Sequence, residues 1–165
     1  MITDYTSYEE VRAALGVTSD ELEDTTLELG VYLSHLNIEF SALGSNFIAY
    51  LDARLAENYT DLNAREKLFV DLAKLYATYT VASHLGPTLS MYALKEETDS
   101  KAGYVRFNDS SKDILADIFS KLLYYRARLI ELYNELNPDT IIPVSATPSV
   151  IFAAATPSQD PVTGV

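Results

Sequence analysis

The side chains that most often carry catalysis or bind metals are few in this sequence. It has two histidines, His35 and His84, and no cysteine. Helical metal sites need ligands about one turn apart, so that they converge on one ion. Neither histidine belongs to a Glu-x-x-His or His-x-x-x-His arrangement. We therefore predict structural roles for both histidines, and neither a metal nor a cofactor.

Carboxylates are plentiful, but they do not form a recognisable site. The acidic clusters within Glu21–Glu28 and Glu96–Asp99 lack the Asp-x-Asp-x-Asp-Gly spacing that wraps calcium. The sequence also lacks a glycine-rich phosphate loop and a Gly-x-Ser-x-Gly nucleophile elbow. A solvated acidic face explains the clusters, and the chain is predicted not to be an enzyme. A pocket lined by both histidines and several carboxylates would reverse that prediction.

The overall charge and composition limit the kinds of partner that the chain can bind. With 12 Lys and Arg against 24 Asp and Glu, the net charge is −12, so there is no surplus of cations to hold nucleic-acid phosphates. Twelve tyrosines favour core and subunit contacts, because amphipathic rings are enriched where chains meet. The start lacks the features of a secretion signal, and no apolar run is long enough to span a membrane. We expect a soluble protein made in the cytoplasm.

Apolar residues recur in threes and fours, which is the spacing of an all-α fold. The chain is organised around a predicted helix over 111–136, whose apolar stripe is Leu115, Ile118, Leu122, Tyr125, Leu129, Leu132 and Leu136. At the other end of the chain, Ser7-x-x-Glu10 has the form of a capping box and opens a short helix over about 7–15. Gly16 suits a left-handed stop after this helix.

Two further long helices are predicted between these elements. The first runs from 19 to about 43, with the stripe Leu22, Thr26, Leu29, Leu33, Leu36, Phe40 and Leu43. Gly44-Ser45-Asn46 either breaks or only bends it, since an apolar face continues to about Glu57. The second runs from Asp61 to Gly86-Pro87, with the stripe Leu68, Leu72, Leu75, Tyr79 and Ala82. A shorter helix through Met91 and Leu94 and a loop over 95–110 follow.

The expected architecture is an antiparallel bundle of three to four long helices, with a short N-terminal helix and an extended C-terminal tail. The composition changes after Leu136, which divides a helical body over 1–136 from a tail over 137–165. Five of the six prolines lie in the tail, which contains no Lys or Arg. Proline at this density forbids a helix and favours extended backbone.

The tail is also too apolar for an ordinary solvated linker. Its apolar residues are Ile141, Ile142, Val144, Val150, Ile151 and Phe152. Extended segments of this kind can add to a partner as a strand, because the backbone pairs while alternate side chains fill pockets. The alternative is a tail that is free or that folds back on its own body. We predict that the six residues form a latch for another protein chain.

The N-terminal residues carry a family resemblance. The stretch Thr6-Ser7-Tyr8-Glu9-Glu10-Val11-Arg12-Ala13-Ala14-Leu15-Gly16-Val17, followed by Ser19–Asp24 and Leu27, resembles the N-terminal signature of tailed-bacteriophage head–tail connector proteins. In that signature, a short helix of the form Ser/Thr-x-Glu-Glu-Val-Lys/Arg-x-x-Leu leads through a valine and an acidic turn into a long helix. The match covers about the first forty residues.

The resemblance implies a structural virion protein of the neck with no enzymatic activity. Members of the family are small helical adaptors that assemble into a ring, typically of twelve copies, beneath the portal. It therefore implies a homo-oligomer that joins portal to tail or nozzle proteins and takes part in genome ejection through a DNA channel. An acidic wall agrees with this expectation, because like charges repel passing DNA. The alternatives are an acidic helical binding module, such as a secretion chaperone, and a small helical enzyme.

Overall fold

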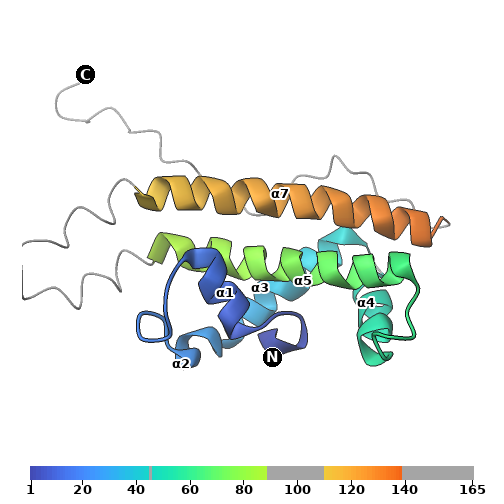
Figure 1. Ribbon diagram of the computed structural model, residues 1–165, viewed down its shortest axis with the longest axis horizontal. Helices are drawn as coiled ribbons and strands as arrows, with labels where there is room; N and C mark the ends of the chain where they lie inside the picture. Colours follow the sequence, from blue (N-terminus) through green and yellow to red (C-terminus); the bar gives the residue numbers. More distant parts are fainter. Residues whose placement is uncertain (45, 89–109, 139–165) are drawn as a thin grey trace, which may run out of the picture.

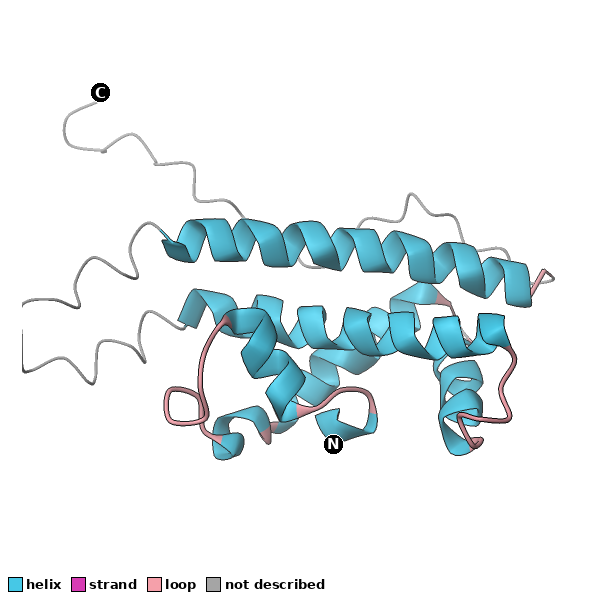
Figure 2. Ribbon diagram, viewed as in Figure 1, coloured by secondary structure: helices cyan, strands magenta, loops and turns pink. Residues whose placement is uncertain are grey.

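The structure is a computed structural model that describes residues 1–44, 46–88 and 110–138 (Figure 1). These residues form six α-helices and two short 3-10 helices, and they contain no strand (Figure 2). The prediction of an all-α protein is confirmed. The predicted helix through Met91 and Leu94, the predicted loop over 95–110 apart from its last residue, and residues 139–165 lie outside the described residues.

Two long helices run side by side, and the shorter helices gather around one of them. The elements in chain order are η1 (Ile2–Asp4), α1 (Tyr8–Leu15), α2 (Asp24–Leu27), α3 (Gly30–Leu43), α4 (Phe47–Ala56), α5 (Ala64–Leu85), η2 (Gly86–Thr88) and α7 (Ser110–Leu136). Figure 1 shows α5 and α7 antiparallel along the long axis of the molecule. Helices α1, α3 and α4 pack against α5.

Helix α7 matches its prediction closely. It ends at Leu136, as the proline at 138 indicates. Ile118, Leu122 and Leu129 of the predicted stripe are buried. This amphipathic face is what holds α7 against α5, because burial of an apolar side chain stabilises a fold by about 1.5–3 kcal/mol.

The prediction of one helix over 19–43 is wrong in its first half. Residues 19–23 form a turn, α2 is a single short helix, and α3 begins only at Gly30. The side chain of Arg12 explains the interruption: its Nε donates a hydrogen bond to the Leu22 carbonyl oxygen at 2.8 Å, so that oxygen does not accept the amide that would continue a helix. Of the two alternatives at Gly44–Asn46, the break is correct, since α4 begins at Phe47.

Helix α5 starts close to the predicted position, and its buried face matches the predicted stripe in part, since Leu72 and Ala82 are buried. Its capping residue is Asn63, whose side-chain oxygen accepts the amides of Arg65 and Glu66 at 2.9 and 3.0 Å. Leu68 and Leu75 of the predicted stripe are 46% and 38% exposed. The buried face instead runs through Phe69, Ala73, Tyr76, Ala77, Thr80 and Ser83. Helices α3, α4 and α7 pack against this face. Its small side chains allow those helices to approach α5 closely.

An aromatic cluster joins four helices at the centre of the core. Phe47 of α4 lies 5.6 Å from Phe40 of α3, 5.7 Å from Phe69 of α5 and 5.1 Å from Tyr133 of α7, measured between ring centroids. All four side chains are almost completely buried. The tilted rings suit the preferred geometry of aromatic pairs, and the cluster fixes how α3, α4 and α7 sit on α5.

Candidate functional site

All the residues of the predicted latch lie outside the described residues: Ile141, Ile142, Val144, Val150, Ile151 and Phe152. The point at which the tail leaves the body is nevertheless fixed. The backbone amide of Asn137 donates to the Tyr133 carbonyl oxygen at 2.8 Å, and the Asn137 side-chain amide donates to the same oxygen at 3.1 Å. The tail therefore departs from the end of α7 that lies beside the start of α5.

The residues that carry the connector resemblance fold as one unit, the N-terminal clasp (residues 6–27). Ser7 caps α1: its hydroxyl accepts the Glu10 amide at 3.2 Å, and the Glu10 carboxylate accepts the Ser7 amide at 3.0 Å. Val11 and Leu15 are buried, and Gly16 ends the helix with φ +70°. The predicted capping box and left-handed stop are confirmed.

The side chain of Arg12 joins α1 to Leu22 and Asp24 within the N-terminal clasp. Its side chain is buried, its Nε bonds to the Leu22 carbonyl oxygen, and its Nη2 pairs with the carboxylate of Asp24. A guanidinium suits this place because its separate N–H groups can serve a carbonyl and a carboxylate at once. The sequence alone assigned Arg12 no partner, although it stands at the basic position of the signature.

Two further contacts join the clasp and the residues before it to the body. The hydroxyls of Thr6 and Thr78 lie 2.6 Å apart, in the interior. The hydroxyl of Tyr5 donates to Asp52 on α4 at 3.1 Å, and burial together with Asp52 raises the pKa of Tyr5 to about 12. The N-terminal residues are thus attached to both α4 and α5.

The two histidines, far apart in the sequence, stack on each other between α3 and α5. Their ring centroids are 4.0 Å apart and their planes differ by 17°. Nε2 of His84 is buried and has no hydrogen-bond partner among the described residues. Burial lowers the pKa of His84, and His35 lowers it further by repulsion between the two cations. The lowered pKa keeps His84 neutral at pH 7.

We predict that the histidine pair makes folding sensitive to mild acid. An unfolded His84 titrates near pH 6.5, whereas the folded one titrates lower, so its stabilising effect is complete above pH 6.5 and is lost as the pH falls toward the folded pKa. In His84→Gln, the free energy of unfolding should decline less than in the wild type over this window. Urea unfolding at a series of pH values measures both slopes.

His35→Gln is the matched control for this prediction. It removes the repulsion on His84 but leaves the burial, which is the larger cause of the shift, so the slope should lie between those of the wild type and His84→Gln. Equal slopes for all three proteins would contradict the assignment.

Glu39, Tyr76 and Arg126 form a polar cluster in the interior, with one member on each of α3, α5 and α7. Their side chains are buried, with 4%, 0% and 4% exposure. The Tyr76 hydroxyl donates to Glu39 Oε2 at 2.9 Å, and Arg126 donates to the Tyr76 oxygen. Burial raises the pKa of Tyr76, and Glu39 raises it further, while Arg126 opposes them. Tyr76 thus lies between two buried side chains of opposite charge.

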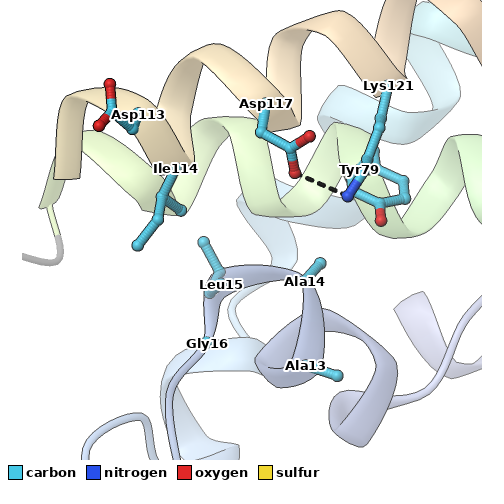
Figure 3. Close-up of a pocket in the computed structure, with 9 residues that line it drawn as sticks. All are labelled: Ala13, Ala14, Leu15, Gly16, Tyr79, Asp113, Ile114, Asp117 and Lys121. Carbon is cyan, nitrogen blue, oxygen red and sulfur yellow. Dashed lines mark ion pairs between the residues drawn. The ribbon is translucent and has the colours of Figure 1, made fainter. Parts of the chain in front are cut away.

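Two separate pockets lie along the α5–α7 pair. The first, of about 400 Å³, lies between the end of α1, Tyr79 and the first turns of α7 (Figure 3). The second, of about 270 Å³, lies over Leu68, Leu72 and Leu132. Positions that line the two pockets recur about two turns apart, Leu72 and Tyr79 on α5 and Lys121 and Arg128 on α7, so both pockets open on the same side of the pair. We call the two pockets together the α5–α7 groove.

Three tyrosines of α5 and α7 pack together and form what we call the tyrosine shelf (Tyr79, Tyr124 and Tyr125), and of these Tyr79 lines the pocket beside α1. Tyr79 and Tyr125 stack with ring centroids 5.4 Å apart, and Tyr124 meets Tyr125 edge-on at 5.4 Å. Tyr124 is 60% exposed. The sequence predicted core or subunit contacts for the tyrosines in general. The structure separates buried ones, such as Tyr76, from the partly open shelf.

The cations along the α5–α7 groove are each paired with a carboxylate. Lys121 bonds to Asp117 at 2.6 Å (Figure 3), Arg128 pairs with Glu131, and Arg65 pairs with Glu135 across the two helices. Lys121 also lies 5.6 Å from the centre of the Tyr79 ring. Beside their apolar residues, the two pockets are therefore lined by three cations and four carboxylates: Lys121, Arg65 and Arg128, and Asp113, Asp117, Glu131 and Glu135.

The part of the chain that the structure describes contains no group of three or more side chains that could hold a metal. None of the described helices has both the length and the apolar character required to cross a membrane. Comparison of the sequence and fold with protein families, with curated proteins and with solved structures finds no match.

Proposed function

We propose that this chain is a head-to-tail adaptor, a structural virion protein of the neck that joins the portal to the tail. The observation that carries the proposal is the N-terminal clasp. The positions that resemble the connector signature have defined structural roles: Ser7 and Glu10 cap α1, Arg12 fastens it to Asp24, and the apolar positions fill its inner side.

In this proposal, copies of the chain form a ring, with twelve as the expected number, around a channel for DNA. The expected bundle of helices makes the ring, and the tail with its apolar latch binds the portal, a tail protein or a neighbouring copy. The net charge of −12 supports a channel that DNA passes without being held, because few cations are available to displace its counterions. The chain acts without a catalytic step.

The direct test is the mass of the purified chain, measured by light scattering, with and without a portal protein. A ring of many copies that binds the portal is the expected result. A monomer or dimer that never associates with a portal would overturn the proposal.

Removal of residues 138–165 is predicted to leave the helices folded and to abolish assembly with the portal. α7 ends at Leu136 and is fixed by its own contacts, so circular dichroism should retain its helical signal. The matched control removes only 153–165, which keeps every latch residue from Ile141 to Phe152, and should assemble normally. Incorporation of the shorter chain at wild-type levels would show that the latch is not needed.

The alternative function is that of an acidic binding module, such as a secretion chaperone. The exposed leucines of α5, Leu68 and Leu75, favour it, because a chaperone holds a client along an apolar surface. A monomer or dimer that co-purifies with one secreted client, and forms no ring, would support this alternative.

A further inference from the structure

We propose that the outer side of α3 binds the same surface of a second copy, so that two copies pair about a two-fold axis. We call this surface the α3 face (Gly30, Val31, Ser34, Asn37, Ile38, Ser41 and Ala42). The inference goes beyond the proposed function, because a pair of copies needs neither a portal nor a tail. A two-fold contact closes on itself, whereas a ring requires a different, head-to-tail contact.

The exposed residues of α3 all lie on one side of the helix. The opposite side packs on the body through Leu36, Glu39, Phe40 and Leu43, which are buried. The residues of the α3 face are exposed and recur three or four positions apart, so they share the side that points away from α5. Two of them are large and apolar: Val31 and Ile38 lie two turns apart and are 49% and 57% exposed.

The α3 face carries no charged side chain, in a chain whose net charge is −12. The one acidic residue of α3, Glu39, is buried on the other side. About a quarter to a third of surface positions are ordinarily charged. Every other described helix of eight or more residues has at least one charged residue among its exposed ones, such as Glu9 on α1, Asp52 on α4, Arg65 on α5 and Asp113 on α7.

This lack of charge favours a second copy as the partner. Two copies that each carry a charge of −12 repel, and a contact that places like charges together costs free energy. The α3 face avoids that cost. In a two-fold pair the same patch of both copies makes the contact, so a charge-free face is its own electrostatic match. A basic partner would be attracted instead to the acidic remainder of the surface.

The polar groups of the α3 face cost little to cover. The Ser34 hydroxyl donates to the Gly30 carbonyl oxygen at 3.0 Å, so its hydrogen bond survives when water is removed. The small side chains let two helices approach closely, while Val31 and Ile38 fill the spaces between them. A 14-residue helix is about 21 Å long. One pair of such helices makes a small contact, so pairing should depend on concentration.

Ile38→Glu in the full-length chain is the direct test, because it brings one new carboxylate from each copy into the contact. The matched control is Leu123→Glu, which adds the same charge at a leucine on α7 that is 51% exposed. Sedimentation velocity without a portal, over a range of concentrations, measures the mass. The wild type and Leu123→Glu should change from one copy to two, and Ile38→Glu should pair at least about tenfold more weakly. Circular dichroism checks that both variants fold.

The salt dependence of pairing tests the charge argument separately. Raising the salt concentration from about 0.05 to about 0.5 M shortens the distance over which charges act. The repulsion between two acidic copies is then screened, so the wild type should pair more tightly. Pairing that weakens with salt would depend on ion pairs rather than on a charge-free face, and would overturn the inference.

Introduced cysteines locate the contact, since the chain has none of its own. Ile38 lies near the middle of α3, where a two-fold axis brings the two copies of one residue closest together. Under mild oxidation, full-length Ile38→Cys should form disulfide-linked dimers at least about tenfold faster than full-length Leu123→Cys, because binding raises the effective concentration of the thiols. A non-reducing gel measures both rates.

Two results would overturn the inference. Equal rates for the two cysteine variants would show that the α3 face does not lie between copies, even in a chain that assembles through another surface. A wild type that stays monomeric at every concentration would leave a different protein as the occupant of this face. If Ile38→Cys links faster but no portal complex appears, the adaptor function fails while the α3 contact stands. A portal complex with equal rates spares the adaptor function alone.

Discussion

Replacement of Glu39 by alanine is expected to lower the free energy of unfolding by about 1–3 kcal/mol, because the buried Tyr76 hydroxyl loses its hydrogen-bond acceptor. Tyr76 is completely buried, so its hydroxyl cannot turn to water when the carboxylate is removed. Urea unfolding at neutral pH, followed by circular dichroism, measures the change.

The matched control for this prediction is Glu135→Ala. Glu135 pairs with Arg65 at the surface, where both side chains are more than half exposed, and an exposed pair contributes at most about 1 kcal/mol. The two variants make the same chemical change, one in the interior and one at the surface. Equal losses for both would show that the interior cluster does not hold α3, α5 and α7 together.

Phe47→Ala is expected to destabilise the chain by about 3–5 kcal/mol, the range for deletion of a large buried aromatic side chain. The cost has two parts, the lost burial of the ring and the cavity left between Phe40, Phe69 and Tyr133. Because the neighbours come from three other helices, they cannot all move to fill the space.

Ile38→Ala provides the comparison, since Ile38 is 57% exposed on α3 and such surface changes usually stay within about 0.5 kcal/mol. Both unfolding curves should keep the wild-type denaturant dependence. A loss for Phe47→Ala below about 1 kcal/mol, a typical cost for an average substitution, would mean that the aromatic cluster is not the centre of the core.

Local sequence patterns predicted the helices whose first and last residues are determined by neighbouring residues in the sequence. Ser7 and Glu10 cap α1 without help from the rest of the chain, and Gly16 and Pro138 mark helix ends through backbone restrictions that act locally. The stripe of α7 was predictable because α7 is covered mainly on one side, so its apolar residues form one face.

Contacts between residues far apart in the sequence determine the features that local sequence patterns did not predict. The helix expected over 19–43 is interrupted because Arg12 binds the Leu22 carbonyl oxygen, a contact that no periodicity encodes. In α5, the predicted stripe included Leu68 and Leu75, which are exposed, whereas the buried face uses alanine, threonine and serine beside Phe69, Leu72 and Tyr76. A helix covered by several neighbours buries small side chains where those neighbours come close, and its leucines can be left at the edge.

The candidate site also combines features that the sequence predicted with features that it did not. The capping box and the basic position of the clasp were visible in the sequence, but the partners of Arg12 were not. The His35–His84 stack and the Glu39–Tyr76–Arg126 cluster each join residues from separate helices. The one available signal was a charged residue within a largely apolar segment, as with Glu39 between Ile38 and Phe40. The latch remains a prediction, because its residues lie outside the described part of the chain.

The position of α7 in the chain has a consequence for biosynthesis. α7 is made after every other described helix, yet it supplies Tyr133, Arg126 and the apolar face that covers α5. Until α7 is made, the side of α5 that α7 covers in the finished fold stays exposed. Interrupted translation at that stage should therefore yield fragments that aggregate or engage host chaperones.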